Sequence, residues 1–193
     1  PLWNPYEMAG KPLLANFQSG VFYPINLILF LKPFYFSWSV FILLQQLLAG
    51  LFLYLYLKNF NLDKRAVFLG TIAFCFSGFF ISWLEWGNIL HTALWLPLIL
   101  LSIDKIIFSK QSPKFWVAAF ILSFSFSFFA GHLQTFFYIF IFSLLYLCVR
   151  LFNFEEKYKK LLIFIPSLFL IFVITLIQLI PTLQFISLSA RNI

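Results

Sequence analysis

Charged residues are scarce in this sequence of 193 residues, which has 13 Lys and Arg and 6 Asp and Glu, together 10%. A soluble domain has about 25% charged and about 45–50% apolar residues, whereas this chain is 63% hydrophobic, with a mean hydropathy of +0.98. These values exclude a water-soluble globular domain and a disordered chain. Two cysteines are too few for a disulfide scaffold. Long unbroken apolar blocks, without the alternation typical of membrane strands, predict an all-α polytopic membrane bundle.

Several catalytic motifs are also missing from the sequence. It has no P-loop, no GxGxxG, no HExxH, no CxxC and no nucleophile elbow. ATP hydrolysis, zinc proteolysis and nucleotide-cofactor redox chemistry therefore lack their signatures, and we predict no cofactor. His91 and His132 lie on separate segments with no Cys or Asp cluster between them, so no metal site is predicted. The net charge of +7 does not indicate a nucleic-acid partner, because the basic residues form short clusters between apolar blocks, as in membrane-protein loops.

Apolar blocks divide the chain. Six of them predict spanning helices at residues 36–57, 66–84, 89–108, 115–130, 133–149 and 161–180. Residues 1–35 are rich in Pro and aromatic residues and contain only a short apolar run, so they predict part of a first outer loop with one or two short interfacial helices. Residues 36–193 then form the bundle.

The fourth and fifth blocks are predicted to form a hairpin. The 35 residues between Lys114 and Arg150 would make about 52 Å of helix, too long for one crossing of about 30 Å. A turn at Gly131-His132 gives two short spans and leaves both basic ends on one side. At mid-depth the polar residues are mainly Gln45 and Gln46, for which we predict interhelical hydrogen bonds; no intramembrane Asp or Glu is predicted.

The basic residues predict the orientation. Ten of the 13 fall in alternate loops, near residues 58–65, 104–114 and 150–160, which the positive-inside rule places in the cytoplasm. The N-terminal region, the turns at 85–88 and 131–132, and the C-terminal end then share the outer face. Both histidines lie on that side, as expected for a membrane enzyme with an aqueous-facing site.

Short strings in order along the chain resemble the YfhO-like bacterial membrane proteins. Residues 3–6 (WNPY), 10–16 (GKPLLAN) and 18–24 (QSGVFYP) look like that family's first outer loop. Further similar pieces are residues 76–78 (FSG), Asn88-Ile89, 95–97 (WLP), 130–132 (AGH) with Gln134, Gln178 with Pro181-Thr182, and 189–191 (SAR).

The resemblance implies a C-type (GT-C) glycosyltransferase architecture in the bacterial cytoplasmic membrane. Such enzymes take a sugar from a polyprenyl-phosphate donor and transfer it, on the extracytoplasmic face, to an acceptor, here a cell-envelope glycan or lipid. An acid in the first outer loop acts as a base or a metal-linked group, which leaves room for a divalent metal. Because the sequence begins inside that loop, we expect a piece of a longer chain whose main catalytic acid precedes residue 1.

The site residues follow from this expectation. Glu7 is the only first-loop carboxylate in view and is the candidate base, while His132, in the tight outer turn, is the second candidate catalytic residue. The leaving phosphate needs cations or hydrogen-bond donors. The candidate substrate-binding residues are Lys11, Asn16, Gln18, Glu85, Asn88, His91, Gln134, Gln178 and Arg191.

Other interpretations of these residues stay open. Glu85 can be an interfacial charge that ends a helix, and His91 can be a packed interfacial histidine. Lys11 and Arg191 can contact lipid headgroups. For the whole chain the alternatives are a transporter or flippase of lipid-linked sugars, which would have ionisable residues at mid-depth and related halves, and a non-catalytic membrane protein.

Overall fold

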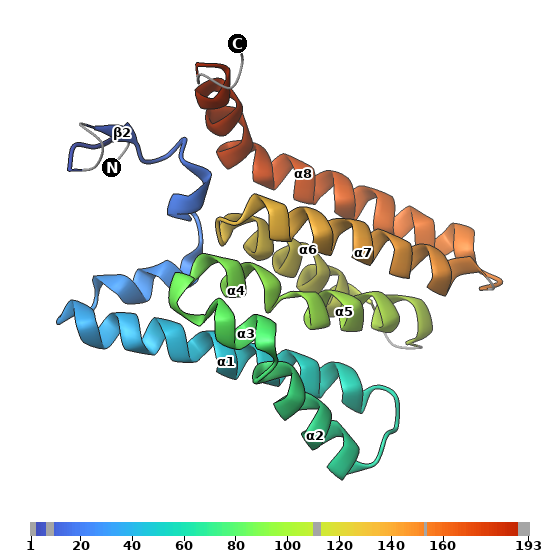
Figure 1. Ribbon diagram of the computed structural model, residues 1–193. Coiled ribbons are helices and arrows are strands. Elements are labelled where there is room, and N and C mark those ends of the chain that lie inside the picture. Colours follow the sequence, from blue (N-terminus) through green and yellow to red (C-terminus); the bar gives the residue numbers. More distant parts are fainter. Residues whose placement is uncertain (1–2, 7–9, 110–112, 153, 189–193) are drawn as a thin grey trace.

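The computed structural model describes residues 3–6, 10–109, 113–152 and 154–188. The N-terminal region pairs two short antiparallel strands, β1 (Trp3–Asn4) and β2 (Lys11–Pro12), and continues into two 3-10 helices, η1 (Phe17–Ser19) and η2 (Pro24–Phe30). It lies to one side of a bundle of helices (Figure 1). The rest of the described chain is helical, in agreement with the predicted all-α membrane bundle.

The helices follow the apolar blocks. Their bounds are α1 Phe34–Lys58, α2 Lys64–Cys75, α3 Gly78–Ser82, η3 Leu84–Trp86, α4 Asn88–Ala93, α5 Leu96–Phe108, α6 Lys114–Phe129, α7 Leu133–Phe152 and α8 Lys157–Ser187. Five segments of the described chain are long and apolar enough to cross a membrane: Phe34–Lys58, Lys64–Ser82, Asn88–Phe108, Leu133–Phe152 and Lys157–Ser187. The apolar helix α6 has 16 residues, or about 24 Å of rise. It is therefore shorter than the membrane core, which is about 30 Å thick.

Two blocks that the sequence predicts as continuous helices are broken. The block at 66–84 separates into α2 and α3 because Ser77 is extended, with a ψ of 155°. The block at 89–108 separates into α4 and α5 just before Pro97, which has no N–H to donate to the preceding turn. In contrast, α8 continues through Pro166 and Pro181 and is longer than the predicted 161–180.

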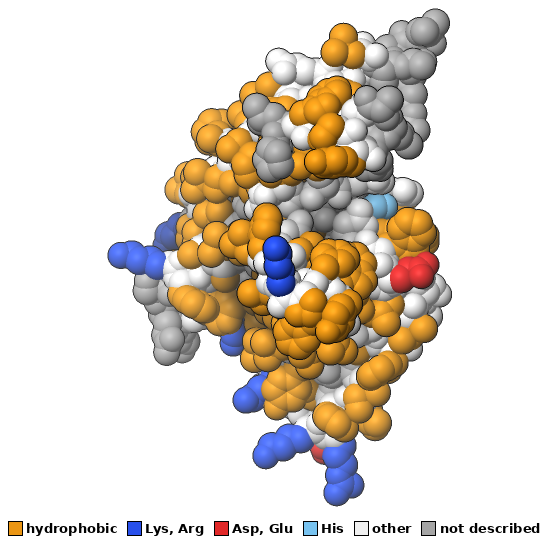
Figure 2. Space-filling view, turned by 90° about the vertical axis from the view of Figure 1, so that its left-hand side faces the viewer, with side chains coloured by type: hydrophobic (Ala, Val, Ile, Leu, Met, Phe, Trp, Pro, Cys, Tyr) orange, Lys and Arg blue, Asp and Glu red, His pale blue; other side chains and the backbone are white. Residues whose placement is uncertain are grey.

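The segment formed by α4 and α5 is the centre of the bundle. In the apolar stretch of this segment 78% of the residues are buried, whereas the corresponding share is 17–28% in the other four segments that could cross a membrane. Figure 1 shows α4 and α5 between α1 on one side and α6, α7 and α8 on the other. The outer helices expose large apolar side chains, such as Phe142 on α7 and Phe169 on α8, which is the surface expected of a protein in lipid. Figure 2 shows hydrophobic side chains over most of the face seen from the N-terminal side.

The three basic loops meet at one end of the bundle, around Asp104 of α5. Arg150 donates from Nε to Asp104 Oδ1 at 2.7 Å, and Tyr146 OH lies 2.9 Å from both carboxylate oxygens. Asn59 Nδ2 is 3.4 Å from Oδ2. Asp104 is 1% exposed and lies within the span Asn88–Phe108. The expectation of no intramembrane acid was therefore wrong: the sequence pattern had assigned Asp104 to the following loop.

The two mid-depth glutamines differ. Gln45 Nε2 donates to Leu84 O at 3.1 Å, which confirms a hydrogen bond between segments. The side-chain amide of Gln46 has no partner among the described residues, so the same prediction for Gln46 was wrong.

At the opposite end, three contacts hold the N-terminal region to the bundle. Gln178 Nε2 on α8 donates to Leu14 O at 2.6 Å. Tyr23 is buried against His91 of α4. Gly131, with a φ of +97°, lets the turn between α6 and α7 approach the backbone of Phe17, whose carbonyl oxygen would be 3.0 Å from a Cβ at Gly131. The predicted outer loop and the predicted outer turn are therefore neighbours.

Candidate functional site

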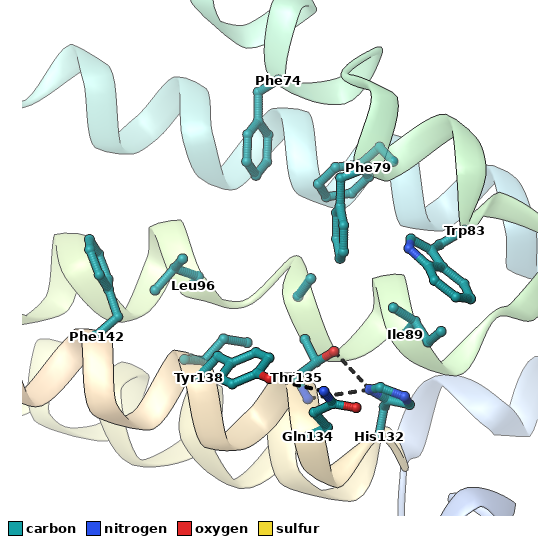
Figure 3. A pocket seen from close by; sticks show the side chains of 13 residues that line it. Phe74, Phe79, Trp83, Ile89, Leu96, His132, Gln134, Thr135, Tyr138 and Phe142 are labelled. Carbon is teal, nitrogen blue, oxygen red and sulfur yellow. Dashed lines mark hydrogen bonds between the residues drawn. The ribbon is translucent and has the colours of Figure 1, made fainter.

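A cavity of about 650 Å³ opens beside the turn between α6 and α7. One wall comes from α2 and α3, the second from α4 and α5, and the third from α7 (Figure 3). Most of its lining is apolar and aromatic, including Phe74, Phe79 and Phe142. Phe79, Trp83 and Phe142 are each 41–50% exposed, so the cavity opens onto the apolar surface of the bundle.

The polar groups of this cavity come from the first turns of α7. His132 directly precedes α7, and its Nδ1 accepts the backbone N–H of Thr135 at 3.3 Å and lies 2.7 Å from Thr135 Oγ1. This is the geometry of a helix N-cap. An amide N–H can only donate, so Nδ1 is the unprotonated nitrogen and Nε2 carries the hydrogen. No described residue accepts a hydrogen bond from Nε2, and this donor is available to a ligand.

The environment of His132 favours its neutral form. Burial lowers the pKa of His132 below the ordinary histidine value, since removal from water disfavours the charged ring. The described side chains that line the cavity include no Asp, Glu, Lys or Arg.

Gln134 and Tyr138 continue the polar edge along α7. Gln134 Nε2 donates to Tyr138 OH at 2.9 Å, and both side chains are exposed. Figure 3 shows His132, Gln134, Thr135 and Tyr138 at the same side of the cavity. An apolar cavity with hydrogen-bonding groups gathered at one end suits an amphiphile with a polar head and a hydrocarbon tail.

Two more cavities border the turn at residues 84–88. One of about 730 Å³ lies between α1 and α3 and is lined by Glu85, and one of about 190 Å³ is lined by Gln18 and Asn88. Consecutive residues line different cavities. Glu85 lines the 730 Å³ cavity and Trp86 the 190 Å³ cavity, while Asn88 lines the 190 Å³ cavity and Ile89 the 650 Å³ cavity. The three cavities therefore surround one turn at the predicted outer end.

The comparison with protein families covers nearly the whole chain. The family described as bacterial membrane protein YfhO matches residues 13–192. The chain belongs to the YfhO family. Searches of curated proteins and of solved structures found no match.

In this YfhO-family chain, the predicted site residues are divided among several places. His132 and Gln134 line the 650 Å³ cavity, Gln18 and Asn88 line the 190 Å³ cavity, and Glu85 lines the 730 Å³ cavity. Glu7 and Arg191 lie outside the described residues.

Four predicted residues of the YfhO-family chain have partners within the protein or positions away from the three cavities. His91 is fully buried, with Nδ1 2.9 Å from Tyr23 OH and Nε2 3.1 Å from Phe41 O, so both ring nitrogens are used inside the protein. The side chain of Gln178 is buried and donates a hydrogen bond to the carbonyl oxygen of Leu14. Asn16 caps η1 by accepting from Gln18 N. Lys11 is half-buried in β2. None of the four lines one of the three cavities.

Thr135 and Tyr138 were not predicted from the sequence. The feature of the sequence that could have identified them is their spacing. They follow His132 by three and six positions and so lie near one face of α7. The described residues include no group of three His, Cys, Asp or Glu side chains placed to hold a metal ion.

Proposed function

We propose that this YfhO-family chain is part of a membrane glycosyltransferase that moves a sugar from a polyprenyl-phosphate donor to a cell-envelope glycan or lipid. The observation that supports it best is the 650 Å³ cavity, apolar along α2, α3 and α5 and polar beside His132. A polyprenyl chain fits the aromatic part, and its phosphate fits the polar end. In this proposal the lipid enters sideways from the bilayer, past Phe79 of α3 and Phe142 of α7, which line the cavity and are exposed on the apolar surface.

In the proposed reaction, an acceptor hydroxyl attacks the anomeric carbon of the donor sugar. The bond between that carbon and the phosphate oxygen breaks, and polyprenyl phosphate leaves with the bonding electrons. His132 Nε2–H donates a hydrogen bond to the phosphate oxygen as its negative charge grows. Gln134 and Tyr138 orient the phosphate or the sugar. A carboxylate takes the hydroxyl proton, and Glu7 is the proposed base within this sequence.

The proposed orientation places the basic end in the cytoplasm of a bacterial cell and the three cavities at the extracytoplasmic face of its inner membrane. It is supported by the convergence of basic loops beside Asp104, where Lys160 also donates to Ile106 O at 2.8 Å.

The test is a transfer assay with the protein in lipid nanodiscs and a radiolabelled polyprenyl-phosphate hexose. His132→Ala is expected to lower turnover about 100-fold, because one hydrogen-bond donor to the leaving group is lost. Thr135→Val removes the hydroxyl that orients the ring and is expected to cause a smaller loss. Gln184→Ala, an exposed amide at the far end of α8, serves as the control and should turn over like the wild type. Wild-type turnover by His132→Ala would remove His132 from the proposed mechanism.

Flipping of lipid-linked sugars is the second candidate function. Two observations favour it: the interrupted segments α2–α3 and α4–α5, and the buried acid Asp104 within a span. A flippase would move a fluorescent polyprenyl-phosphate sugar between leaflets of a proteoliposome without breaking the glycosidic bond. Release of polyprenyl phosphate distinguishes the transferase from the flippase.

A further inference from the structure

The cavity of about 190 Å³ is built from four segments of the chain, one of which is α1 with Trp38 and Phe41. Gln18 and Asn26 come from the N-terminal region, Trp86 and Asn88 from the turn before α4, and Ala130 from the end of α6. It is much smaller than the 650 Å³ cavity, and the two are separated by the turn at 130–132. Its size suits one sugar ring rather than a lipid chain.

Uncommitted amide groups point to a ligand rich in hydroxyl groups. The side chains of Gln18 and Asn88 make no hydrogen bond with any described residue, although both line the cavity. Asn26 uses Nδ2 to donate to Gly20 O at 2.8 Å, which leaves its Oδ1 as an acceptor. Each primary amide offers donors and an acceptor in one plane. Such groups can pair with neighbouring hydroxyls of a sugar.

Two tryptophans supply the apolar part of the lining. Trp38 is held in a row of rings, 6.1 Å from Phe34 and 5.7 Å from Phe41 between centroids. Trp86 also lines the cavity and is 60% exposed. Gly87, with a φ of +63°, allows this turn to approach Phe41, since a Cβ there would be 2.9 Å from the ring. The flat face of an indole can cover the C–H face of a sugar ring while the amides bind its edge.

The lack of charged side chains in the described lining of this cavity favours an uncharged ligand. The described residues that line this cavity include no acidic or basic side chain. A phosphate or carboxylate would lose its hydration there without a cationic partner, whereas a neutral polyol would exchange water for amide hydrogen bonds. We propose that the 190 Å³ cavity is a subsite for one uncharged sugar ring. This choice of ligand rests on the proposed function, because either the donor sugar or a sugar of the acceptor can occupy it.

The experiment measures binding of methyl glycosides of glucose, galactose and N-acetylglucosamine to the protein in nanodiscs by saturation-transfer NMR. At least one glycoside is expected to bind saturably. Asn88→Ala and Gln18→Ala should each weaken that binding tenfold or more, and the matched amide variant Gln184→Ala should not change it. No saturable binding by the wild type, or equal weakening by Gln184→Ala, would overturn the proposal.

A second measurement separates this proposal from the proposed function and identifies the source of the sugar. Polyprenyl-phosphate hexose is added to the glycoside-loaded protein. Displacement of the glycoside assigns the subsite to the donor sugar, and simultaneous binding of both assigns it to the acceptor. Glycoside binding with no transfer in the radiolabel assay would refute the transferase and keep the sugar subsite. Transfer without glycoside binding would refute the sugar subsite and keep the transferase.

Discussion

The hydroxyl of Tyr23 donates to Nδ1 of His91 at 2.9 Å, across 68 residues of sequence. Trp95 Nε1 donates to the same hydroxyl at 3.3 Å, and His91 Nε2–H donates to Phe41 O. Three segments, namely the N-terminal region, α1 and the segment formed by α4 and α5, are thus joined by one buried set of hydrogen bonds. Because all its members are satisfied, removal of a single group leaves the others without a partner in a region closed to water.

Tyr23→Phe is expected to destabilise the protein by about 2 kcal/mol, since His91 Nδ1 and Trp95 Nε1 both lose their partner. The measurement is unfolding in mixed detergent micelles. Tyr35→Phe is the control because Tyr35 is 76% exposed. Faster proteolysis within residues 10–23 should accompany the loss. Equal stability of the two variants would contradict the structural role of Tyr23.

Arg150→Ala is expected to cost about 3 kcal/mol, because it leaves the 1% exposed Asp104 carboxylate without its cation. Asp104→Asn combined with Arg150→Ala should cost less than the sum of the single changes, as for two groups in direct contact. The exposed pair Lys159–Glu156 is the control, and Lys159→Ala should have little effect on unfolding. Additive costs at Asp104 and Arg150 would argue against the ion pair.

Gly131→Ala is expected to destabilise the protein by about 1–2 kcal/mol, since φ at this position is +97° and a Cβ would crowd Phe17 O. Gly78→Ala is the matched change, because a Cβ at Gly78 meets nothing within 4 Å. Thermal unfolding of the two variants gives the comparison. A loss of stability confined to Gly78→Ala would show that the loop and turn do not pack as described.

His132 is expected to titrate below the ordinary histidine pKa of about 6.5. The unfolded chain then binds the proton first, so the stability contributed by neutral His132 is present above that value and is lost as pH falls through the lowered folded-state pKa. Diethyl pyrocarbonate labelling followed by peptide mass spectrometry reports the titration. The buried His91 should react far more slowly than His132. Bound polyprenyl phosphate should raise the pKa of His132, because an anion favours the charged ring.

Labelling of single cysteines tests the proposed orientation. In a background with Cys75 and Cys148 replaced by Ala, Asp63→Cys and Glu85→Cys each place a thiol at an exposed position. An impermeant maleimide added to intact cells is expected to label the cysteine at 85 and not that at 63. The opposite pattern would invert the topology and place the three cavities in the cytoplasm.

The helices could be predicted from the sequence, because a long apolar run can cross a membrane in few structures other than a helix. The turn at Gly131-His132 was predicted from the length of the block and the basic residues at both of its ends, and the structure has α6 end at Phe129 and α7 begin at Leu133. The interruption at Ser77 was not predicted, because it depends on one extended residue inside an otherwise apolar block.

Side-chain convergence was harder to predict than the helices. The sequence pattern assigned both histidines to the outer face of the membrane. In the structure His132 lines a cavity, whereas His91 is buried and hydrogen-bonded to Tyr23, which is distant in sequence. Asp104 was missed as an intramembrane residue because its partners, Tyr146 and Arg150, come from another helix. A linear pattern locates a residue along its own helix and does not show which residues of distant segments surround it.

The hydrogen bond from Gln178 to Leu14 also constrains the order in which the protein is assembled. The two residues are separated by 164 positions, and at synthesis rates of about 5–20 residues per second the second emerges roughly ten seconds or more after the first. Until α8 is inserted, the outer segment lacks this anchor to the bundle. The cavities beside that segment are therefore completed only after α8 has been synthesised, when the preceding hydrophobic helices have already entered the bilayer.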